Sequence, residues 1–560
     1  MPASPASTYG WEPLQTRVDG REASKDERRR TRLAATLTGL AAGLFAFLLY
    51  LSTLAPGVLR YERPALLDPV MLQTQAHALG ITHPTGYPTW VLVSHLFTHL
   101  PFESPAYWTN LASAVWATAA VVLVYLICLR LSKRVIPAAA AALVFAVGET
   151  FWSQAVIAEV YTMNAMFVAA VVYVLFLWRD SGRDAYLLLA AFLTGLSLTH
   201  HLTSGLLLPA GLLFVWLVRR ETLRRWGLMF KAAGLFSLAL TPYLYLPVRA
   251  SMRPEIMEAD PSASFGSFFE FATGTKLTST IVSLRPGVLV SEIGTYAGHL
   301  SANLHWAFVL LAACGLGAMF ARDRAAALLT GFLFAGWFVY ALMYNIHNIY
   351  IYFIPTYAML AIWASAGLAE LLRGVRALAA RFPADFPRGF GRVAVVLVSA
   401  VALLVPLVGA AETHAAVDRS GDEEGRRTIE AVAENVEPGA TVIHHRSALW
   451  YMVVVEERRR DLTLVDPFYP EWNEHHDTVW PGIVGPAEAE ARYGTDDYSG
   501  MESARIAAEK GPVYILDHEE FFDAERYREA GFEVSEVSQE GQGVYRLVPP
   551  DPPPPGLLRG

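Results

Sequence analysis

Long apolar runs alternate with short polar segments over the first three quarters of the chain. Each run is bounded by charged residues or turn formers, and a helix that crosses a bilayer needs about 20 apolar residues. The pattern predicts an α-helical polytopic membrane protein with about eleven spans. The expected spans are 34–54, 105–131, 136–148, 156–178, 185–198, 202–218, 228–247, 302–320, 325–345, 350–372 and 393–411.

The apolar stretch 185–218 is too long for a single span, and arginine-rich segments flank both of its ends. Both ends are therefore expected on the same side of the membrane, with a helical hairpin that turns near Thr199-His200-His201. The two arms are short, as is the run 136–148. Some helices are thus expected to be broken or to cross only part of the bilayer.

Lysine and arginine concentrate in every second loop, which sets an orientation by the positive-inside rule. With a cytoplasmic N-terminus, the basic segments on the cytoplasmic side are 28–32, 130–134, 179–183, 219–231, 322–324 and 373–392. The predicted organisation is a basic cytoplasmic tail (1–33) and a membrane domain (34–411), with the remainder outside. Two long outside loops, 55–104 and 248–301, belong to this membrane domain.

The residues after 411 alternate strand-like and helix-like stretches. Helices are expected at 448–459 and 519–530, and strands at 440–444, 462–465, 513–516, 532–535 and 544–548. We predict an extracytoplasmic α/β domain over 412–548 with a mainly parallel sheet, followed by a disordered Pro-rich tail at 549–560. The domain sequence contains no phosphate loop or nucleophile elbow, so support or acceptor recognition is its expected role.

The composition agrees with a membrane protein: 54% of residues are hydrophobic and 17% are charged, against about 45–50% and 25% in soluble domains. From Glu412 onward there are 31 acidic and 14 basic residues, a net charge of −17; the other 21 acidic and 30 basic residues leave +9. The acidic part has no basic patch, so no nucleic-acid partner is expected.

Few ionisable residues fall inside the apolar runs, and no inverted repeat of hydropathy is visible. Ion-coupled transporters tend to have ionisable residues inside their spans and to have duplicated halves, so both absences weigh against such a transporter. The polar residues concentrate in the outside loops instead, which favours an enzyme. The alternatives are a lipid or polysaccharide transporter or flippase, and a catalytically inactive scaffold of the same fold.

Asp68 is the candidate catalytic residue. It lies in the first outside loop, near the membrane surface, where a carboxylate can take the proton of an acceptor hydroxyl as a general base. Asp68-Pro69 also fits a helix start, with Asp68 as the N-cap and proline at the first helical position. The two roles are compatible because a cap fixes the carboxylate without consuming it.

Four residues in two outside segments are candidates for substrate binding. His83 and Tyr87 lie in the rigid turn His83-Pro-Thr-Gly-Tyr-Pro88, for which an interfacial turn with Tyr87 in the aromatic belt is the alternative. Glu159 and Tyr161 lie where two spans meet on the outside. A buried carboxylate there must be paired or face a cavity, and a structural hydrogen bond is the alternative.

Three further candidates suit a phosphate. His200 and His201 occupy the predicted hairpin turn, and Arg249 lies at the outer end of a span, where a guanidinium can hold a lipid phosphate bidentately. Snorkelling to ordinary head groups is the alternative for Arg249. The adjacent histidines lack the i, i+4 spacing of ligands on one helix face, so no metal site is predicted.

Four runs together resemble the motifs of one family: Gly80-Ile-Thr-His-Pro-Thr-Gly-Tyr-Pro88, Phe151-Trp-Ser-Gln-Ala-Val-Ile-Ala-Glu-Val-Tyr161, Gly195-Leu-Ser-Leu-Thr-His-His-Leu-Thr203 and Tyr243-Leu-Tyr-Leu-Pro-Val-Arg249. The family is a bacterial membrane family catalogued as a domain of unknown function. It is similar to the transmembrane protein O-mannosyltransferases of the C-type (GT-C) glycosyltransferase superfamily. The resemblance covers residues 45–370.

The resemblance implies a GT-C-like fold and an inverting enzyme. The enzyme would transfer a sugar, with mannose as one candidate, from a polyprenyl-phosphate donor to an extracytoplasmic protein or envelope-glycan acceptor. Counting back from Gly80 places Asp68 on the family's acidic residue. Two positions depart from the family pattern: Met71 stands where the family has Glu, and His200 where it has Asn. Met71 favours the inactive-scaffold alternative.

The implied chemistry needs few partners. Arg249 with His200 and His201 would neutralise the donor phosphate, and Asp68 would deprotonate the acceptor. No tightly bound cofactor is expected, and the need for a divalent metal stays open. The expected partners are the lipid-linked donor, the acceptor and membrane lipids. The expected location is the bacterial plasma membrane, with the N-terminus cytoplasmic.

Overall fold

The computed structural model describes residues 17–18, 21–22, 25–60, 67–258, 260–275, 285–344, 346, 348–381, 389–466, 498–517, 523–539 and 542–550. The chain forms two compact units. The helical unit comprises Met1–Leu54, Leu111–Pro242 and Leu277–Arg419, and the mixed unit comprises Ala55–Asn110, Tyr243–Lys276 and Ser420–Gly560. Hydropathy assigns both long loops to the membrane domain, whereas in the structure the first loop and the start of the second group with the residues beyond 419.

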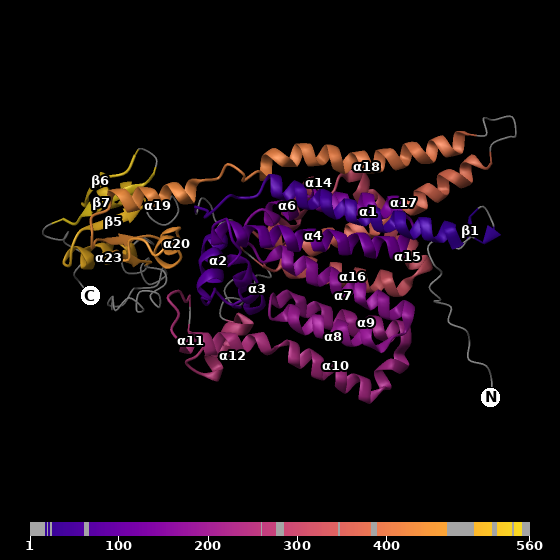
Figure 1. Ribbon diagram of the computed structural model, residues 1–560, viewed down its shortest axis with the longest axis horizontal. Helices are drawn as coiled ribbons and strands as arrows, with labels where there is room; N and C mark the ends of the chain where they lie inside the picture. Colours follow the sequence, from indigo (N-terminus) through magenta and orange to yellow (C-terminus); the bar gives the residue numbers. More distant parts are fainter. Residues whose placement is uncertain are drawn as a thin grey trace. The chain divides into compact units, whose positions relative to one another are not determined.

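The helical unit consists of apolar helices, many of which lie side by side in Figure 1. The helices are α1 (Lys25–Ser52), α4 (Pro105–Ser132, whose first residues belong to the mixed unit), α5 (Val135–Ala146), α6 (Glu149–Ala155), α7 (Tyr161–Ser181), α8 (Asp184–Leu198), α9 (Leu207–Arg219), α10 (Trp226–Ala239), α14 (Pro286–Asn303), α15 (Trp306–Arg322), α16 (Arg324–Leu342), α17 (Ile354–Ala379) and α18 (Phe390–Val417). Short 3-10 helices are η2 (Leu202–Leu206), η3 (Arg220–Arg224), η4 (Thr241–Leu244) and η5 (Ile349–Phe353), and the strand β1 (Arg17–Val18) pairs with β2 (Arg21–Glu22).

Each of the eleven predicted apolar runs contains a helix. Among the described residues, eight helices are long and apolar enough to cross a membrane, or ten if each of two bent pairs is one span. The bends are 67° between α5 and α6 and 105° between α14 and α15. The helix α8 is shorter, as expected for an arm of the hairpin, and Thr199 to His201 form its turn.

The helix ends differ from the hydropathy limits. Helix α1 begins at Lys25, so the end of the polar segment 1–33 is helical, and α18 extends to Val417. The physical reason is that a charged or polar side chain at a helix end can reach water while its backbone stays helical. Of the tail predicted to be disordered, residues 551–560 lie outside the described residues.

Helices α15 and α17 approach each other closely through two glycines. A Cβ on Gly315 would lie 1.8 Å from the carbonyl oxygen of Trp363, and a Cβ on Gly367 would lie 1.9 Å from that of Leu311. Apolar helices in lipid associate by van der Waals packing, and small residues allow this close approach. The contact therefore depends on the absence of side chains at these two positions.

The mixed unit contains a five-stranded sheet with the strand order β4-β3-β5-β7-β6. The strands are β3 (Thr441–Ile443), β4 (Thr463–Val465), β5 (Val513–Leu516), β6 (Glu533–Glu536) and β7 (Val544–Val548). The helices around the sheet are α19 (Glu424–Asn435), α20 (Leu449–Val454), α23 (Tyr498–Ala508) and α24 (Ala524–Glu529), and several carry labels in Figure 1. The apolar core includes Ile443, Val465, Ile515, Tyr527 and Leu547.

The sheet is mixed, and the prediction of a mainly parallel sheet is wrong in this respect. Strand β3 pairs in parallel with β4 and β5, whereas β7 pairs antiparallel with both β5 and β6. Residues 537–543 join β6 to β7 and are too few for a parallel crossover, which needs a dozen residues or more. The chain therefore turns back as a hairpin, and β7 lies between β5 and β6.

The rest of the mixed unit comes from the two long loops. It contains α2 (Leu67–Ala78), α3 (Pro88–Thr98), α11 (Tyr245–Ser251) and α12 (Phe265–Thr273). A small core joins the two loops through Ile81, Leu246, Ala250, Met257 and Phe271. An isolated parallel bridge pairs Ile81 with Met257.

The contact between α15 and α17 gives a stability prediction. Gly315→Ala should lower the free energy of unfolding by about 1–3 kcal/mol, because the new methyl group meets a backbone oxygen that cannot move aside. Gly317→Ala in the same helix is the matched control, since a Cβ there has no neighbour within 4 Å in the described structure. The measurement is the thermal midpoint of purified protein in detergent. Equal midpoints for the two variants would contradict the close approach.

Candidate functional site

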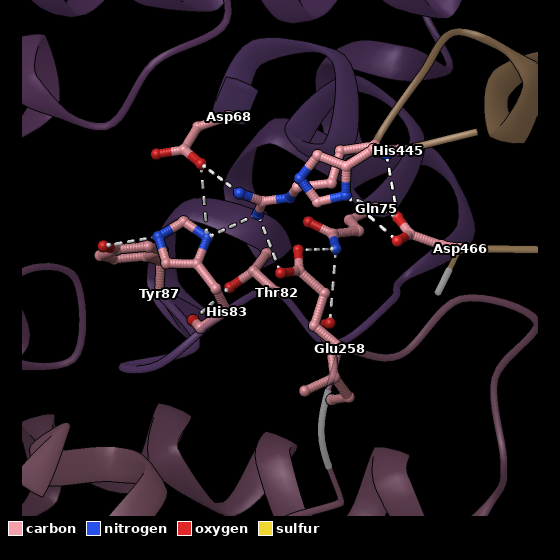
Figure 2. A network of polar contacts seen from close by, with 10 residues as sticks. Asp68, Gln75, Thr82, His83, Tyr87, Glu258, His445 and Asp466 are labelled. Atoms are coloured by element: carbon pink, nitrogen blue, oxygen red, sulfur yellow. Dashed lines mark hydrogen bonds and ion pairs between the residues drawn. The ribbon is translucent and has the colours of Figure 1, made fainter. Parts of the chain in front are cut away.

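A polar network that includes Asp68, His83 and Glu258 lies within the mixed unit (Figure 2), and Arg446 is at its centre. Arg446 Nη1 donates to Asp68 Oδ1 at 3.2 Å, and Nη2 donates to Glu258 Oε2 at 2.9 Å. His83 Nδ1 lies 3.5 Å from Nη2 and 3.8 Å from Asp68 Oδ1. Three side chains, two from the first loop and one from the second, thus meet at the guanidinium of Arg446, which comes from the α/β region.

The sheet determines where Arg446 lies. Arg446 follows the end of β3, and Asp466 follows the end of β4, its parallel neighbour. Carboxyl ends of parallel strands meet at one edge of a sheet, where α/β proteins commonly bind ligands. Asp466 Oδ2 accepts the backbone N–H of Arg446 at 3.0 Å, and both carboxylate oxygens lie 3.1 Å from His445 Nδ1.

The backbone of Arg446 is in the left-handed region, with φ of 38°. A side-chain-bearing residue there costs on the order of 1–3 kcal/mol. The bond from its N–H to Asp466 helps to hold this conformation. Burial raises the pKa of the Asp466 carboxyl, but His445, His444 and the Arg446 N–H outweigh burial and keep the pKa below its ordinary value.

Asp68 lies in the first turn of α2, just after the first helical residue, Leu67, and thus inside the helix rather than at its N-cap. The N–H groups of a helix N-terminus favour a negative charge there. Burial alone would raise the pKa of Asp68, but His83 and the charge and hydrogen bond of Arg446 outweigh burial and hold the pKa below its ordinary value. The side chain is 26% exposed, so this ionised carboxylate is accessible from solvent.

Glu258 forms the buried end of the network. Its side chain is only 1% exposed and accepts a bond from Gln75 Nε2 at 2.7 Å in addition to the bond from Arg446. Its backbone N–H donates to the carbonyl oxygen of Ile81 beside the bridge with Met257. A buried carboxylate is tolerated only when paired, so Glu258 and Arg446 depend on each other.

His83 and Tyr87 belong to one tight turn. His83 Nε2 lies 3.1 Å from the Tyr87 hydroxyl, and the rings meet edge to face with centroids 5.1 Å apart. Gly86 closes the turn with φ of 84°, and a Cβ there would lie 2.7 Å from Leu246. The local sequence therefore builds the turn that carries His83 to Asp68.

Arg249 has protein partners in this structure. Its Nε donates to the carbonyl oxygen of Leu79 at 2.7 Å and its Nη2 to that of Ala78 at 2.9 Å. These carbonyls lie at the C-terminal end of α2, where a positive charge is favourable. The guanidinium predicted to hold a phosphate thus also fixes the helix that carries Asp68.

The other four predicted residues belong to the helical unit. Glu159 is buried between α6 and α7, and its Oε2 accepts the N–H of Val160. Tyr161 and His201 pack with ring centroids 5.9 Å apart. His200 Nε2 lies 2.8 Å from the carbonyl oxygen of Val160. These four residues form one buried cluster at the turn before α7 and the turn after α8.

Sequence reasoning therefore found two groups of residues but missed the centre of the first. Asp466 comes directly after the predicted strand 462–465, and Arg446 comes two residues after the end of the predicted strand 440–444. The rule for carboxyl ends of parallel strands would have indicated both. His445 follows from the same rule. Glu258 has no local signal, because its importance comes from the pairing of two distant loops.

The network suits proton transfer from a hydroxyl group. It offers an accessible ionised carboxylate in a fixed position, with a histidine and an arginine beside it. Over the described part of the chain, no group of three or more His, Cys, Asp or Glu residues could hold a metal ion.

Sequence comparison matches residues 71–224 to one family model, the N-terminal domain of Protein O-mannosyl-transferase TMEM260. Protein O-mannosyl-transferase TMEM260 of Mus musculus is 30% identical over 259 residues, which are 43% of this chain and 37% of the mouse protein. The match thus spans well under half the length of this curated relative.

Two solved structures are similar over most of the chain. ArnT from Cupriavidus metallidurans bound to undecaprenyl phosphate has a TM-score of 0.57 at 14% identity, with 91% of this chain and 97% of that chain covered. The Archaeoglobus fulgidus oligosaccharyltransferase tethered with an acceptor peptide has a TM-score of 0.50 at 12% identity, with 91% and 74% covered. At these identities the likeness concerns the fold. Together with the apolar helices, it identifies an integral membrane protein.

The mutual dependence of Arg446 and Glu258 gives a stability prediction. Arg446→Gln should lower the free energy of unfolding by about 3–5 kcal/mol, because it leaves the Glu258 charge buried without its partner. Adding Glu258→Gln should recover a large part of that loss. Arg460→Gln removes an exposed ion pair with Glu255 and should cost at most about 1 kcal/mol. The thermal midpoints of the purified variants measure these differences in stability. A double variant no more stable than Arg446→Gln would contradict the mutual dependence of Arg446 and Glu258.

His444, beside this network, gives a pH prediction. Burial lowers the pKa of His444 to about 4, with Asp466 opposing and His445 adding to the effect. Between the ordinary value of about 6.5 and pH 4, the unfolded state binds a proton that the folded state does not, so stability falls as the pH falls through this window. The loss should approach about 3 kcal/mol. Thermal midpoints from pH 7 to pH 4 should fall less steeply for His444→Gln, and parallel curves would refute the assignment.

Proposed function

We propose that this chain is a membrane glycosyltransferase of the C-type (GT-C) fold, because its fold is similar to that of ArnT and its residues 71–224 match the model of the TMEM260 N-terminal domain. It transfers a sugar from a polyprenyl-phosphate donor to a hydroxyl group of a protein or envelope glycan. The observation that carries the proposal is the ionised, accessible Asp68 carboxylate, which Arg446 and His83 hold in a helix outside the candidate spans.

The reaction is a single displacement at the anomeric carbon. Asp68 takes the proton of the acceptor hydroxyl, the acceptor oxygen forms the new glycosidic bond, and the bond to the lipid phosphate breaks. The polyprenyl phosphate leaves with the electron pair of the broken bond. Because the acceptor oxygen attacks the face opposite this leaving group, the configuration at the anomeric carbon inverts. Because the donor contains its own leaving group, the reaction needs no nucleotide at this site.

A lipid phosphate donor is supported by the likeness to ArnT, whose structure was solved with undecaprenyl phosphate bound. Within the helical unit, we keep Glu159, Tyr161, His200 and His201 as the residues that bind the donor. Arg249 stays a candidate for the donor phosphate, in addition to its two bonds to the end of α2. Mannose is the first sugar to test, because the mouse relative is named as an O-mannosyl-transferase.

The proposed orientation places the N-terminus in the cytoplasm and residues 412–560 outside a bacterial plasma membrane. The loop charges support it through the positive-inside rule. Acceptor, donor head group and Asp68 are then on the same side of the membrane. The acceptor is an extracytoplasmic protein or glycan.

An inactive scaffold is the second candidate, because Met71 replaces the family's glutamate. Met71 is fully buried in α2. The second carboxylate of the network is Glu258, which is bonded to Arg446 beneath the surface. The site thus keeps two carboxylates although the family position is apolar, and this favours the enzyme over the scaffold. A transporter is disfavoured because the Asp68 network lies in helices and loops outside the candidate spans.

The direct test is sugar transfer by purified protein in detergent, with labelled undecaprenyl-phosphate sugars, mannose first, and an envelope extract as acceptor. Asp68→Asn should lower transfer at least about 100-fold, the contribution typical of a general base. Asp461→Asn is the control, because Asp461 is a more exposed carboxylate of the same unit that pairs with Arg459. Parallel assays with EDTA decide whether a divalent metal is needed.

Two outcomes would overturn the proposal. Full activity of a folded Asp68→Asn variant would remove Asp68 as the base. Absence of both transfer and donor hydrolysis, for every sugar of the panel and with the wild-type protein folded, would favour the scaffold.

A further inference from the structure

We propose that Arg446 is a positioning residue through which the α/β region holds the base Asp68, and that it serves the base rather than the donor phosphate. The inference rests on the proposed function, since it assigns a role within that reaction. It gives the α/β region a part in catalysis beyond support or acceptor recognition. It also predicts which kinetic constants change when Arg446 is replaced.

The first argument is how the guanidinium is occupied. Nη1 bonds Asp68, and Nη2 bonds Glu258. An arginine that binds a phosphate bidentately presents two parallel N–H groups to it. Here the two terminal nitrogens each bond a different carboxylate, so a bidentate phosphate contact through them would require both bonds to break.

The second argument is the order of burial through the network. The exposed fraction rises from 1% for the Glu258 side chain to 7% for Arg446 and 26% for Asp68. A substrate that arrives from solvent therefore meets Asp68 first, with Arg446 behind it and Glu258 deepest. This order fits an accessible base held by a buried cation.

The third argument is that Arg446 is itself held in place. Asp466 accepts its backbone N–H, and Glu258 is fixed by Gln75 and by the backbone beside Ile81. Positions in an active site must be held to a fraction of an ångström, and a misplacement of 1 Å can cost on the order of 100-fold in rate. Strand β4, through Asp466 and Arg446, thus contributes to the position of Asp68.

The charges around Asp68 make the proposal sensitive to pH. The groups that face or support Asp68 are His83 from the loop after α2, Arg446 from the end of β3 and, behind Arg446, Glu258, His445 and Asp466. Arg446 contributes both a positive charge and a hydrogen bond that hold the pKa of Asp68 down. Its removal should move the acidic limb of the rate profile to higher pH, because Asp68 then binds a proton more readily.

The experiment measures kcat, KM for the donor and the pH profile, with undecaprenyl-phosphate mannose or whichever undecaprenyl-phosphate sugar of the panel is transferred fastest. The variants are Arg446→Lys, which keeps the charge, and the double variant Arg446→Gln/Glu258→Gln, which avoids an unpaired buried charge. Arg460→Gln is the matched control, since Arg460 joins the same two parts of the chain through an exposed pair with Glu255.

We expect the double variant to lose on the order of 100-fold in kcat with KM for the donor changed less than about twofold. Its acidic limb should shift to higher pH, and Arg446→Lys should recover part of kcat and part of the shift. The control should match the wild type in all three quantities.

Each other outcome contradicts the inference in a distinct way. A higher KM for the donor at unchanged kcat would make Arg446 a phosphate ligand. A lower kcat with an unmoved acidic limb in folded protein would make its role merely structural. Normal kinetics of the double variant, with Asp68→Asn inactive, would overturn this inference and leave the proposed function intact. Activity of Asp68→Asn, or no transfer by the wild type, would overturn both.

Discussion

One guanidinium bonded to two carboxylates organises the polar centre of the mixed unit. Arg446 and Glu258 are almost fully buried, and a buried charge is stable only with its partner. Arg446 comes from the α/β region, Glu258 from the second long loop and Asp68 from the first. These three segments must therefore fold together, and the accessible carboxylate takes its place only when they do.

The two units are stabilised by different interactions. Helices in the helical unit satisfy their own backbone hydrogen bonds, as a lipid environment demands, and two of them approach through glycines. The loops of the mixed unit are held by a small apolar core and a turn that only glycine can close. Arg249 adds to this rigidity by bonding the end of α2.

The likeness to ArnT over most of the chain at 14% identity has a physical explanation. Spanning helices need apolar side chains but tolerate many different ones, so the fold survives extensive replacement. A site is less tolerant because each charge needs a partner. In this network Arg446 is paired with both Asp68 and Glu258, which come from two different loops.

The sequence by itself determined the apolar helices, the hairpin turn at Thr199 to His201 and the strands of the α/β region, and it indicated Asp68 and His83 as candidate site residues. These features follow from local hydrophobicity, turn residues and motifs. The tertiary structure alone decided that the sheet is mixed and that Arg249 bonds the end of α2. It also decided that Arg446 bonds Asp68, 378 positions away in the chain. The reason is that a charged side chain takes its partner from whatever the fold brings near, and local sequence does not contain that information.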